Sequence, residues 1–173
     1  MLVFLALAAV QPVSVPPVPI IAPTVRPLGD QGSERSRVER TVDEVYRVIS
    51  GPAGRPRDWP LMKAYFTPDA RLYAVGSRGL SGGSIDDYIA KAGPNLIKVG
   101  FTEKELTRRV EIYGNLAQVW SSYAGTSTDG SVNVRGINSF QLARQPDGGW
   151  LVHSILWQAE NPTLPLPKDM EAR

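Results

Sequence analysis

Few side chains in this sequence could carry out chemistry, and His153 is the first of them. It is the single histidine of the chain, which has no cysteine. Strand alternation predicts that His153 shares a face with Leu151, Ile155 and Trp157, where it could act as a general acid or base toward a bound molecule. A half-buried histidine that hydrogen-bonds to a neighbour fits the same pattern, so both interpretations stay open.

Asp69 is the second candidate base. It follows Pro68 in a predicted turn, a position where aspartate also commonly caps the backbone. Asp86 and Asp87 lie in the first turn of a predicted helix, where their charge suits the helix dipole. The predicted catalytic residues are therefore His153 and Asp69.

Composition argues against several other kinds of site. Without cysteine there is no thiol nucleophile, disulfide or thiolate zinc site, and one histidine cannot form a multi-histidine metal cluster. The 19 basic and 17 acidic residues leave a net charge of +2, which does not suggest a nucleic-acid-binding protein. No apolar run reaches the ~18 residues of a membrane-spanning helix. We expect no metal, no cofactor, no nucleic-acid partner and no membrane span.

The chain divides into three segments by composition. Residues 1–32 form an apolar and proline-rich leader, which is either a signal peptide with a truncated start or a disordered apolar tail. Residues 33–161 form the predicted folded domain, and residues 162–173 form a proline-rich tail. A true signal peptide would make the protein periplasmic or secreted; otherwise it is expected to be cytoplasmic.

Three helices are predicted in the first half of the domain. The first begins at an N-cap, Ser33, carries an apolar valine stripe, and ends before Gly51. The second opens at Asp58 and has Pro60 in its first turn. The third begins at Ser84 with a capping box and ends at Gly93-Pro94.

Strands are predicted over 70–75, 102–113, 116–127, 132–145 and 149–160, and the last four are joined by short turns that contain glycine. Residues 76–83 are rich in glycine and are predicted to form a loop. The fold class is α+β, with a curved antiparallel sheet of four to six strands wrapped around three N-terminal helices. Such a cone-like barrel leaves a concave pocket at its mouth.

Three segments carry a resemblance to a known family: Tyr65–Leu72, Arg135–Phe140 and Gly149–Trp157. In these segments and in the order of elements, the chain resembles the nuclear-transport-factor-2-like superfamily, which includes SnoaL-like cyclases and ketosteroid isomerase. The resemblance spans about residues 35–160 and implies the cone-like fold. This fold supports enzymes, binding modules and assembly domains, so the resemblance does not settle the activity.

The resemblance also bears on chemistry. Ketosteroid isomerase has its aspartate base in the strand after the Asp-Ala pair, where this sequence has Leu72–Val75 and no carboxylate. Isomerase chemistry is therefore not carried over. The acidic oxyanion donor of the isomerase corresponds to Asn138, whose amide could donate to a ligand oxygen or satisfy neighbouring groups of the protein.

Aromatic residues come from every predicted element, and some would line a cavity while others fill the core. The residues predicted to bind a ligand are Asn138, Trp59, Tyr65, Tyr73, Tyr88, Trp120 and Trp157. The sequence predicts a SnoaL-like pocket protein that binds a small apolar or aromatic molecule, with no assured catalysis.

Two alternatives stay open. The first is an isomerase, dehydratase or cyclase-type enzyme that uses His153 or Asp69 with Asn138. The second is a non-enzymatic module that forms a homodimer through its sheet face, for which the polar and aromatic alternation of Gln118, Trp120 and Ser122 suits a half-exposed surface. Dimerisation is compatible with either of the other two functions.

Overall fold

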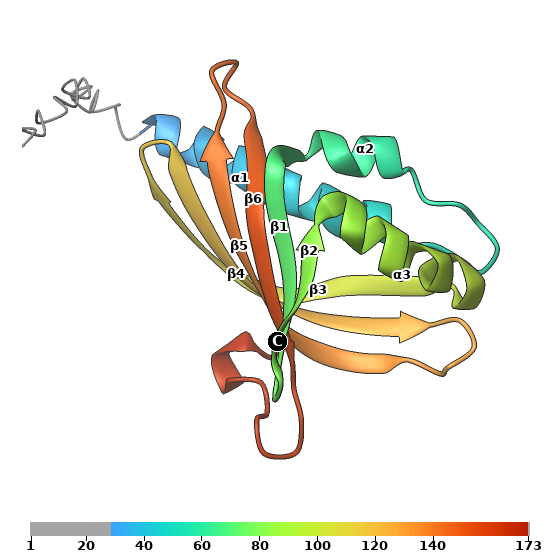
Figure 1. The fold of residues 1–173 in the computed structure, drawn as a ribbon. Coiled ribbons are helices and arrows are strands. Elements are labelled where there is room, and N and C mark those ends of the chain that lie inside the picture. The colour runs from blue at the N-terminus through green and yellow to red at the C-terminus, as the bar shows by residue number, and fades with distance from the viewer. Residues whose placement is uncertain (1–28, 173) are drawn as a thin grey trace, which may run out of the picture.

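The computed structural model describes residues 29–172, so most of the predicted leader lies outside the described residues. Three helices, α1 (Gly29–Ile49), α2 (Trp59–Ala64) and α3 (Ile85–Val99), accompany six strands. The strands are β1 (Phe66–Gly76), β2 (Gly79–Ser84), β3 (Phe101–Tyr113), β4 (Leu116–Ser127), β5 (Asn133–Arg144) and β6 (Trp150–Ala159). They form one twisted sheet in the order β2-β1-β6-β5-β4-β3 (Figure 1). None of the helices in this part of the chain is long and apolar enough to cross a membrane.

The α+β class is confirmed, and the four long strands lie within one or two residues of their predicted ranges. The prediction of an antiparallel sheet is wrong for one pair of neighbouring strands. β1 pairs with β6 in parallel, while the other neighbouring strands are antiparallel. The two parallel strands are far apart in the sequence, so no local turn signal indicates their pairing. The sheet is mixed and does not close into a barrel.

The glycine-rich segment predicted as a loop contains β2. This strand pairs antiparallel with β1, and Gly82 lies opposite Tyr73. A Cβ atom on Gly82 would come within 1.9 Å of the Leu72 carbonyl oxygen, so the close approach of the two strands requires glycine here. Because glycine is disfavoured in strands, the glycine-rich sequence of this segment did not indicate β2.

Two helix ends differ from their predictions. α1 begins at Gly29, so Ser33 lies within the helix and is not its N-cap. α3 continues through Pro94 to Val99, although proline inside a helix removes one backbone hydrogen bond. The carbonyl oxygens of the last turns of α3 are bound by other segments: Leu96 accepts from Arg57, and Ile97 accepts from the backbone of Gly54. The capping box of Ser84 and Asp87 is confirmed, as is the N-cap at Asp58.

The core lies between α1 and the sheet. Val38 and Val42 of α1 are fully buried and belong to the same apolar cluster as Phe140 of β5 and Val152 of β6. The first turns of α1 are tied to the sheet by Trp150, whose Nε1 donates to Glu34 Oε2 at 2.8 Å. The segment after β6 also contributes buried side chains, Leu166 and Met170.

One buried arginine organises the loop between α1 and α2. Arg57 is 7% exposed and donates to backbone carbonyls only. Its guanidinium reaches the carbonyl oxygens of Ile49 at 3.0 Å, Gly51 at 2.6 Å and Leu96 at 3.0 Å. These bonds satisfy the C-terminal end of α1 and join it to α3, which forms one wall of the cavity described below.

Replacement of Arg57 by alanine should lower the free energy of unfolding by about 3 kcal/mol, because several buried carbonyls would lose their donor. Arg57→Lys should recover only part of this loss, since an ammonium cannot reach the same carbonyls with a planar fork. Urea denaturation of both variants measures the change. The exposed neighbour Arg55 provides a matched control, Arg55→Ala, which should stay close to the parent. Equal stability of Arg57→Ala and Arg55→Ala would refute this role.

Candidate functional site

A cavity of about 410 Å³ lies between the helices and the inner face of the sheet. Its walls are mainly aliphatic and aromatic, with side chains from all three helices and five strands. The lining residues include Val45, Ile49, Met62, Leu72, Tyr88, Leu96, Phe101, Tyr123, Val134, Phe140, Ile155 and Trp157. Exposed residues such as Asn95 and Ala159 also border the cavity, so it opens to solvent on their side.

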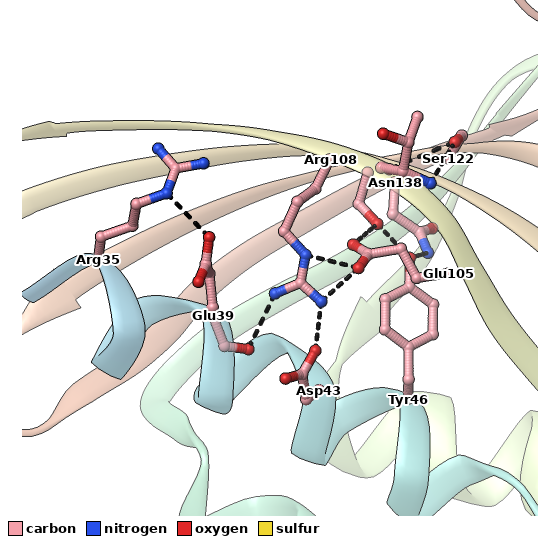
Figure 2. A network of polar contacts seen from close by, with 10 residues as sticks. Arg35, Glu39, Asp43, Tyr46, Glu105, Arg108, Ser122 and Asn138 are labelled. Atoms are coloured by element: carbon pink, nitrogen blue, oxygen red, sulfur yellow. Dashed lines mark hydrogen bonds and ion pairs between the residues drawn. The ribbon is translucent and has the colours of Figure 1, made fainter. Parts of the chain in front are cut away.

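A directed hydrogen-bond network enters this apolar space. Asn138 Nδ2 donates to the Tyr46 hydroxyl at 2.9 Å and to Glu103 Oε1 at 3.0 Å. Because Ser121 gives its single hydroxyl proton to the Glu105 carboxylate, the Tyr46 hydroxyl is the donor to Ser121 Oγ, 2.6 Å away. Ser121 in turn donates to Glu105 Oε1 at 2.5 Å. The network therefore joins α1 to β3, β4 and β5 through buried polar atoms, and Figure 2 shows Tyr46 reaching from α1 toward the strands.

Glu103 is the carboxylate of the cavity. The residue is half-buried, and burial raises the pKa of its carboxyl to about 7, although the hydrogen bond from Asn138 acts in the opposite direction. Among the described residues it has no ion-pair partner. The nearby Arg108 instead pairs with Asp43 and Glu105 (Figure 2). A carboxyl in this state can exchange a proton near neutral pH or attract a positive charge.

Two further hydroxyls lie in the cavity wall. Tyr88 on α3 and Tyr123 on β4 have no hydrogen-bond partner for their hydroxyl groups among the described residues. Burial raises the pKa of both hydroxyls, and the negative charge of Glu103 adds to that effect. Tyr88 also packs edge-on against Trp157, with ring centroids 6.3 Å apart. The cavity is therefore apolar with a few polar atoms around Glu103.

His153 and Asp69 lie together outside the cavity. His153 Nδ1 is 3.1 Å from Thr67 Oγ1 and 3.7 Å from Asp69 Oδ1, and both side chains are largely exposed. The hydrogen bond from Thr67, with a smaller contribution from His153, lowers the pKa of the Asp69 carboxyl. Neither residue lines the cavity with Asn138. Their predicted catalytic roles stay predictions, at a position separate from the cavity.

The prediction that His153 shares a face with Ile155 is wrong because β6 is irregular there. Gln141 pairs with Ser154 and Leu142 with Val152, so His153 is an extra residue opposite β5. The bulge shifts the alternation, and Val152 and Ile155 both point into the core although they are three residues apart. His153 is directed to solvent as a result.

The predicted ligand-binding residues divide into two groups. Asn138, Tyr88 and Trp157 line the cavity, whereas Trp59, Tyr65, Tyr73 and Trp120 do not. Trp59 packs against Gly93 of α3, and Tyr65 lies close to Glu44 of α1. Both amide hydrogens of Asn138 are used within the protein, so its Oδ1 is the atom left for a ligand. The binding roles themselves remain predictions.

Trp120 belongs to the outer face of the sheet. Trp120 lies opposite Ser139 of β5, and Ser139 lies opposite Leu156 of β6. The side chains of Trp120 and Leu156 are 37% and 41% exposed. Gln118 is also exposed, but Ser122 is buried and bonds to the Thr107 backbone at an irregular point of the β3–β4 ladder. The sheet-face homodimer stays a prediction, and Trp120 and Leu156 mark the surface it would use.

Sequence reasoning missed Glu103 and Tyr46. Tyr46 follows Val42 by four residues and precedes Ile49 by three, so the helical period could have placed it on the buried face. Glu103 alternates with exposed Thr102 and Lys104, a pattern that puts a carboxylate on the inner face of the strand. No local signal indicates that Asn138 would meet both.

Comparison by sequence finds no matching family model and no matching curated protein. Comparison of structures finds many similar chains. An NTF2-like superfamily protein from Salmonella enterica is 20% identical, with a TM-score of 0.61 over 77% of this chain and 95% of that one. A hexachlorocyclohexane dehydrochlorinase from Novosphingobium barchaimii is 12% identical, with a TM-score of 0.61 over 76% and 90%. A Nostoc punctiforme protein with a cystatin-like fold is 12% identical, with a TM-score of 0.58 over 77% and 95%.

The pH dependence of stability tests the burial of Glu103. The pKa of its carboxyl rises from 4.5 in the unfolded chain to about 7 in the folded protein, so the folded state binds the extra proton between these values. Stability should therefore fall as the pH rises through this range. The Glu103→Gln variant keeps an acceptor for Asn138 and has no charge to bury.

The parent should lose about 3 kcal/mol of unfolding free energy relative to Glu103→Gln between about pH 5 and about pH 8. Urea denaturation of both proteins across this range gives the difference, in which the contributions of other titrating groups cancel. Parallel stability profiles would mean that the carboxyl is solvated.

Proposed function

We propose that this chain, which has the nuclear-transport-factor-2-like fold, binds a small and largely apolar molecule in the cavity between its helices and sheet. The observation that carries the proposal is a cavity whose apolar walls converge on one set of polar atoms at Glu103 and Asn138. Ligand sites of proteins commonly combine apolar walls with a few placed polar groups that orient the ligand.

Size and access support the same conclusion. A volume of about 410 Å³ lies within the range of small-molecule sites, which is roughly 300–1,000 Å³. The cavity is bordered on its open side by Asn95 of α3 and Ala159 at the end of β6. A ligand could therefore enter without displacement of the buried core around Phe140.

Proton transfer is a second candidate function, and the state of Glu103 favours it. A general base or acid works best when its pKa lies near the working pH, and the pKa of this carboxyl is raised to about 7. The dehydrochlorinase among the structural neighbours has the same fold, but at 12% identity it contributes no residue roles. His153 and Asp69 line neither this cavity nor the hollow beside Glu105 and Arg108, so catalysis by either would need a substrate bound on the outer side.

Binding can be tested with N-phenyl-1-naphthylamine, an uncharged dye whose fluorescence rises in apolar surroundings. The parent should bind it saturably at one site per chain. Ala159→Trp, which adds bulk at the mouth of the cavity, should weaken binding by about tenfold or more.

The matched control is Gln158→Trp, because Gln158 is exposed and does not line the cavity. It should bind the dye as the parent does. Absence of saturable binding by the parent, or equal weakening by both substitutions, would count against a ligand cavity.

Proton abstraction can be tested with 5-nitrobenzisoxazole, a small aromatic compound that opens when a base removes its carbon-bound proton. The proton passes to the carboxylate, the nitrogen–oxygen bond breaks, and a cyanophenolate leaves. If Glu103 is the base, the protein-dependent rate should rise with a midpoint near the carboxyl pKa of about 7 and disappear in Glu103→Gln. A rate that Glu103→Gln leaves unchanged would exclude this residue as the base.

A further inference from the structure

We infer that the cavity accepts a ligand with an apolar body and one positive charge, an ammonium-type cation, which lies against Glu103 and is surrounded by aromatic rings. The inference rests on the proposed function, since it names the class of molecule for the same cavity. Three features support it: an unpaired carboxylate, an excess of hydrogen-bond acceptors, and the arrangement of the rings.

The carboxylate of Glu103 has no cationic partner in the part of the chain that the structure describes. It is the one charged side chain among the described residues that line the cavity. The two arginines nearby are engaged elsewhere: Arg108 of β3 pairs with Asp43 and Glu105, and Arg47 of α1 pairs with Glu44 at 2.5 Å. Carboxylates in such surroundings are costly unless they are paired, so a positively charged ligand would supply the missing interaction.

The free polar atoms of the cavity are mostly acceptors. Asn138 uses both amide hydrogens, one for Tyr46 and one for Glu103, so its Oδ1 faces a ligand only as an acceptor. An ionised Glu103 is also only an acceptor, and the hydroxyls of Tyr88 and Tyr123 can accept as well as donate. A ligand that brings hydrogen-bond donors or positive charge complements this set, whereas a carboxylate ligand would be repelled.

Aromatic rings line the same cavity as the carboxylate. The cavity is lined by the rings of Tyr46, Tyr88, Phe101, Tyr123 and Trp157. Gly125 lies opposite Glu103 across the β3–β4 ladder, and a Cβ there would come within 2.6 Å of the Phe101 ring. Glycine at this position therefore gives the Phe101 ring its place beside Glu103. Faces of aromatic rings attract cations, most strongly where water is excluded.

Charged and titratable groups near Glu103 come from every element packed against it. They are Asp43, Tyr46 and Arg47 on α1, Tyr88 on α3, Tyr123 on β4, and Lys104, Glu105 and Arg108 on its own strand. Burial raises the pKa of the three tyrosine hydroxyls, which keeps them neutral. The carboxyl pKa of about 7 lies inside the range in which a ligand titration is practical.

The opposite preference would arise if Glu103 acted as a neutral acid that donates a hydrogen bond to an uncharged ligand. Binding of such a ligand would weaken as the pH rises, because the carboxyl loses its proton. Binding of a cation would strengthen over the same range, because the ionised form is the one that attracts it. The sign of the pH dependence therefore separates the two ligand classes.

The experiment compares phenyltrimethylammonium with tert-butylbenzene, which has the same shape and no charge, and with benzoate. Affinities are measured by displacement of N-phenyl-1-naphthylamine from the full chain. The cation should bind about tenfold more tightly at about pH 8 than at about pH 6, as the carboxyl ionises, while the hydrocarbon should not change. Glu103→Gln should weaken binding of the cation by about tenfold and remove its pH dependence, with the hydrocarbon unaffected.

The rings are tested by Tyr88→Leu and Tyr88→Phe. The leucine variant should weaken binding of the cation by about threefold or more, whereas the phenylalanine variant keeps the ring and should bind like the parent. The inference is overturned if the hydrocarbon or benzoate binds while the cation does not. It is also overturned if Glu103→Gln weakens binding of the cation and of the hydrocarbon equally. In both cases the proposal of a ligand cavity is retained. If neither the dye nor any of the three compounds binds, the proposed function fails together with the inference.

Discussion

The amide group of Asn138 is the contact on which the candidate site depends. Its two hydrogens link the hydroxyl of Tyr46 on α1 to the carboxyl of Glu103 on β3, and the amide itself comes from β5. A carboxylate can only accept, so the amide nitrogen must face Glu103, and this fixes the orientation of the whole group. At the other end of the network, Ser121 donates its proton to Glu105, so the Tyr46 hydroxyl donates to Ser121. The carboxylates of Glu103 and Glu105 thereby set the donor directions of a network that crosses the core from helix to sheet.

The same network offsets only part of the free-energy cost of burying the charged form of Glu103. A single neutral hydrogen bond from Asn138 offsets only part of the cost of burial, which is why the pKa of the carboxyl stays raised at about 7. Arg108 could have neutralised such a charge, but its guanidinium pairs with Asp43 of α1 and with Glu105 instead. Among the described residues, the acid of this apolar cavity therefore has no counter-ion. Natural proteins retain such a destabilising group mainly where it serves binding or catalysis.

Local patterns in the sequence predicted the elements better than their contacts. Alternation identified the four long strands, and capping residues located the starts of α2 and α3, because these signals act within a few residues. The glycines of β2 and Pro94 of α3 misled the prediction, since close strand pairing and tertiary packing overrode local preference. The bulge at His153 reversed the expected face of one strand. The sequence indicated Asn138, Tyr88 and Trp157 as cavity-lining residues, but it did not indicate Glu103 and Tyr46. Both contact Asn138, from which they are separated by 35 and 92 residues in the sequence.

Carbon-13 NMR of the glutamate carboxyl groups tests most directly whether Glu103 is an unpaired carboxyl in an apolar cavity. The Glu103 resonance is assigned by its absence from the spectrum of Glu103→Gln. On titration of the parent, its chemical shift should move with a midpoint near the pKa of about 7 that burial produces. A midpoint close to the usual glutamate value of about 4.3 would show that water solvates the carboxyl, and would contradict the account of the cavity.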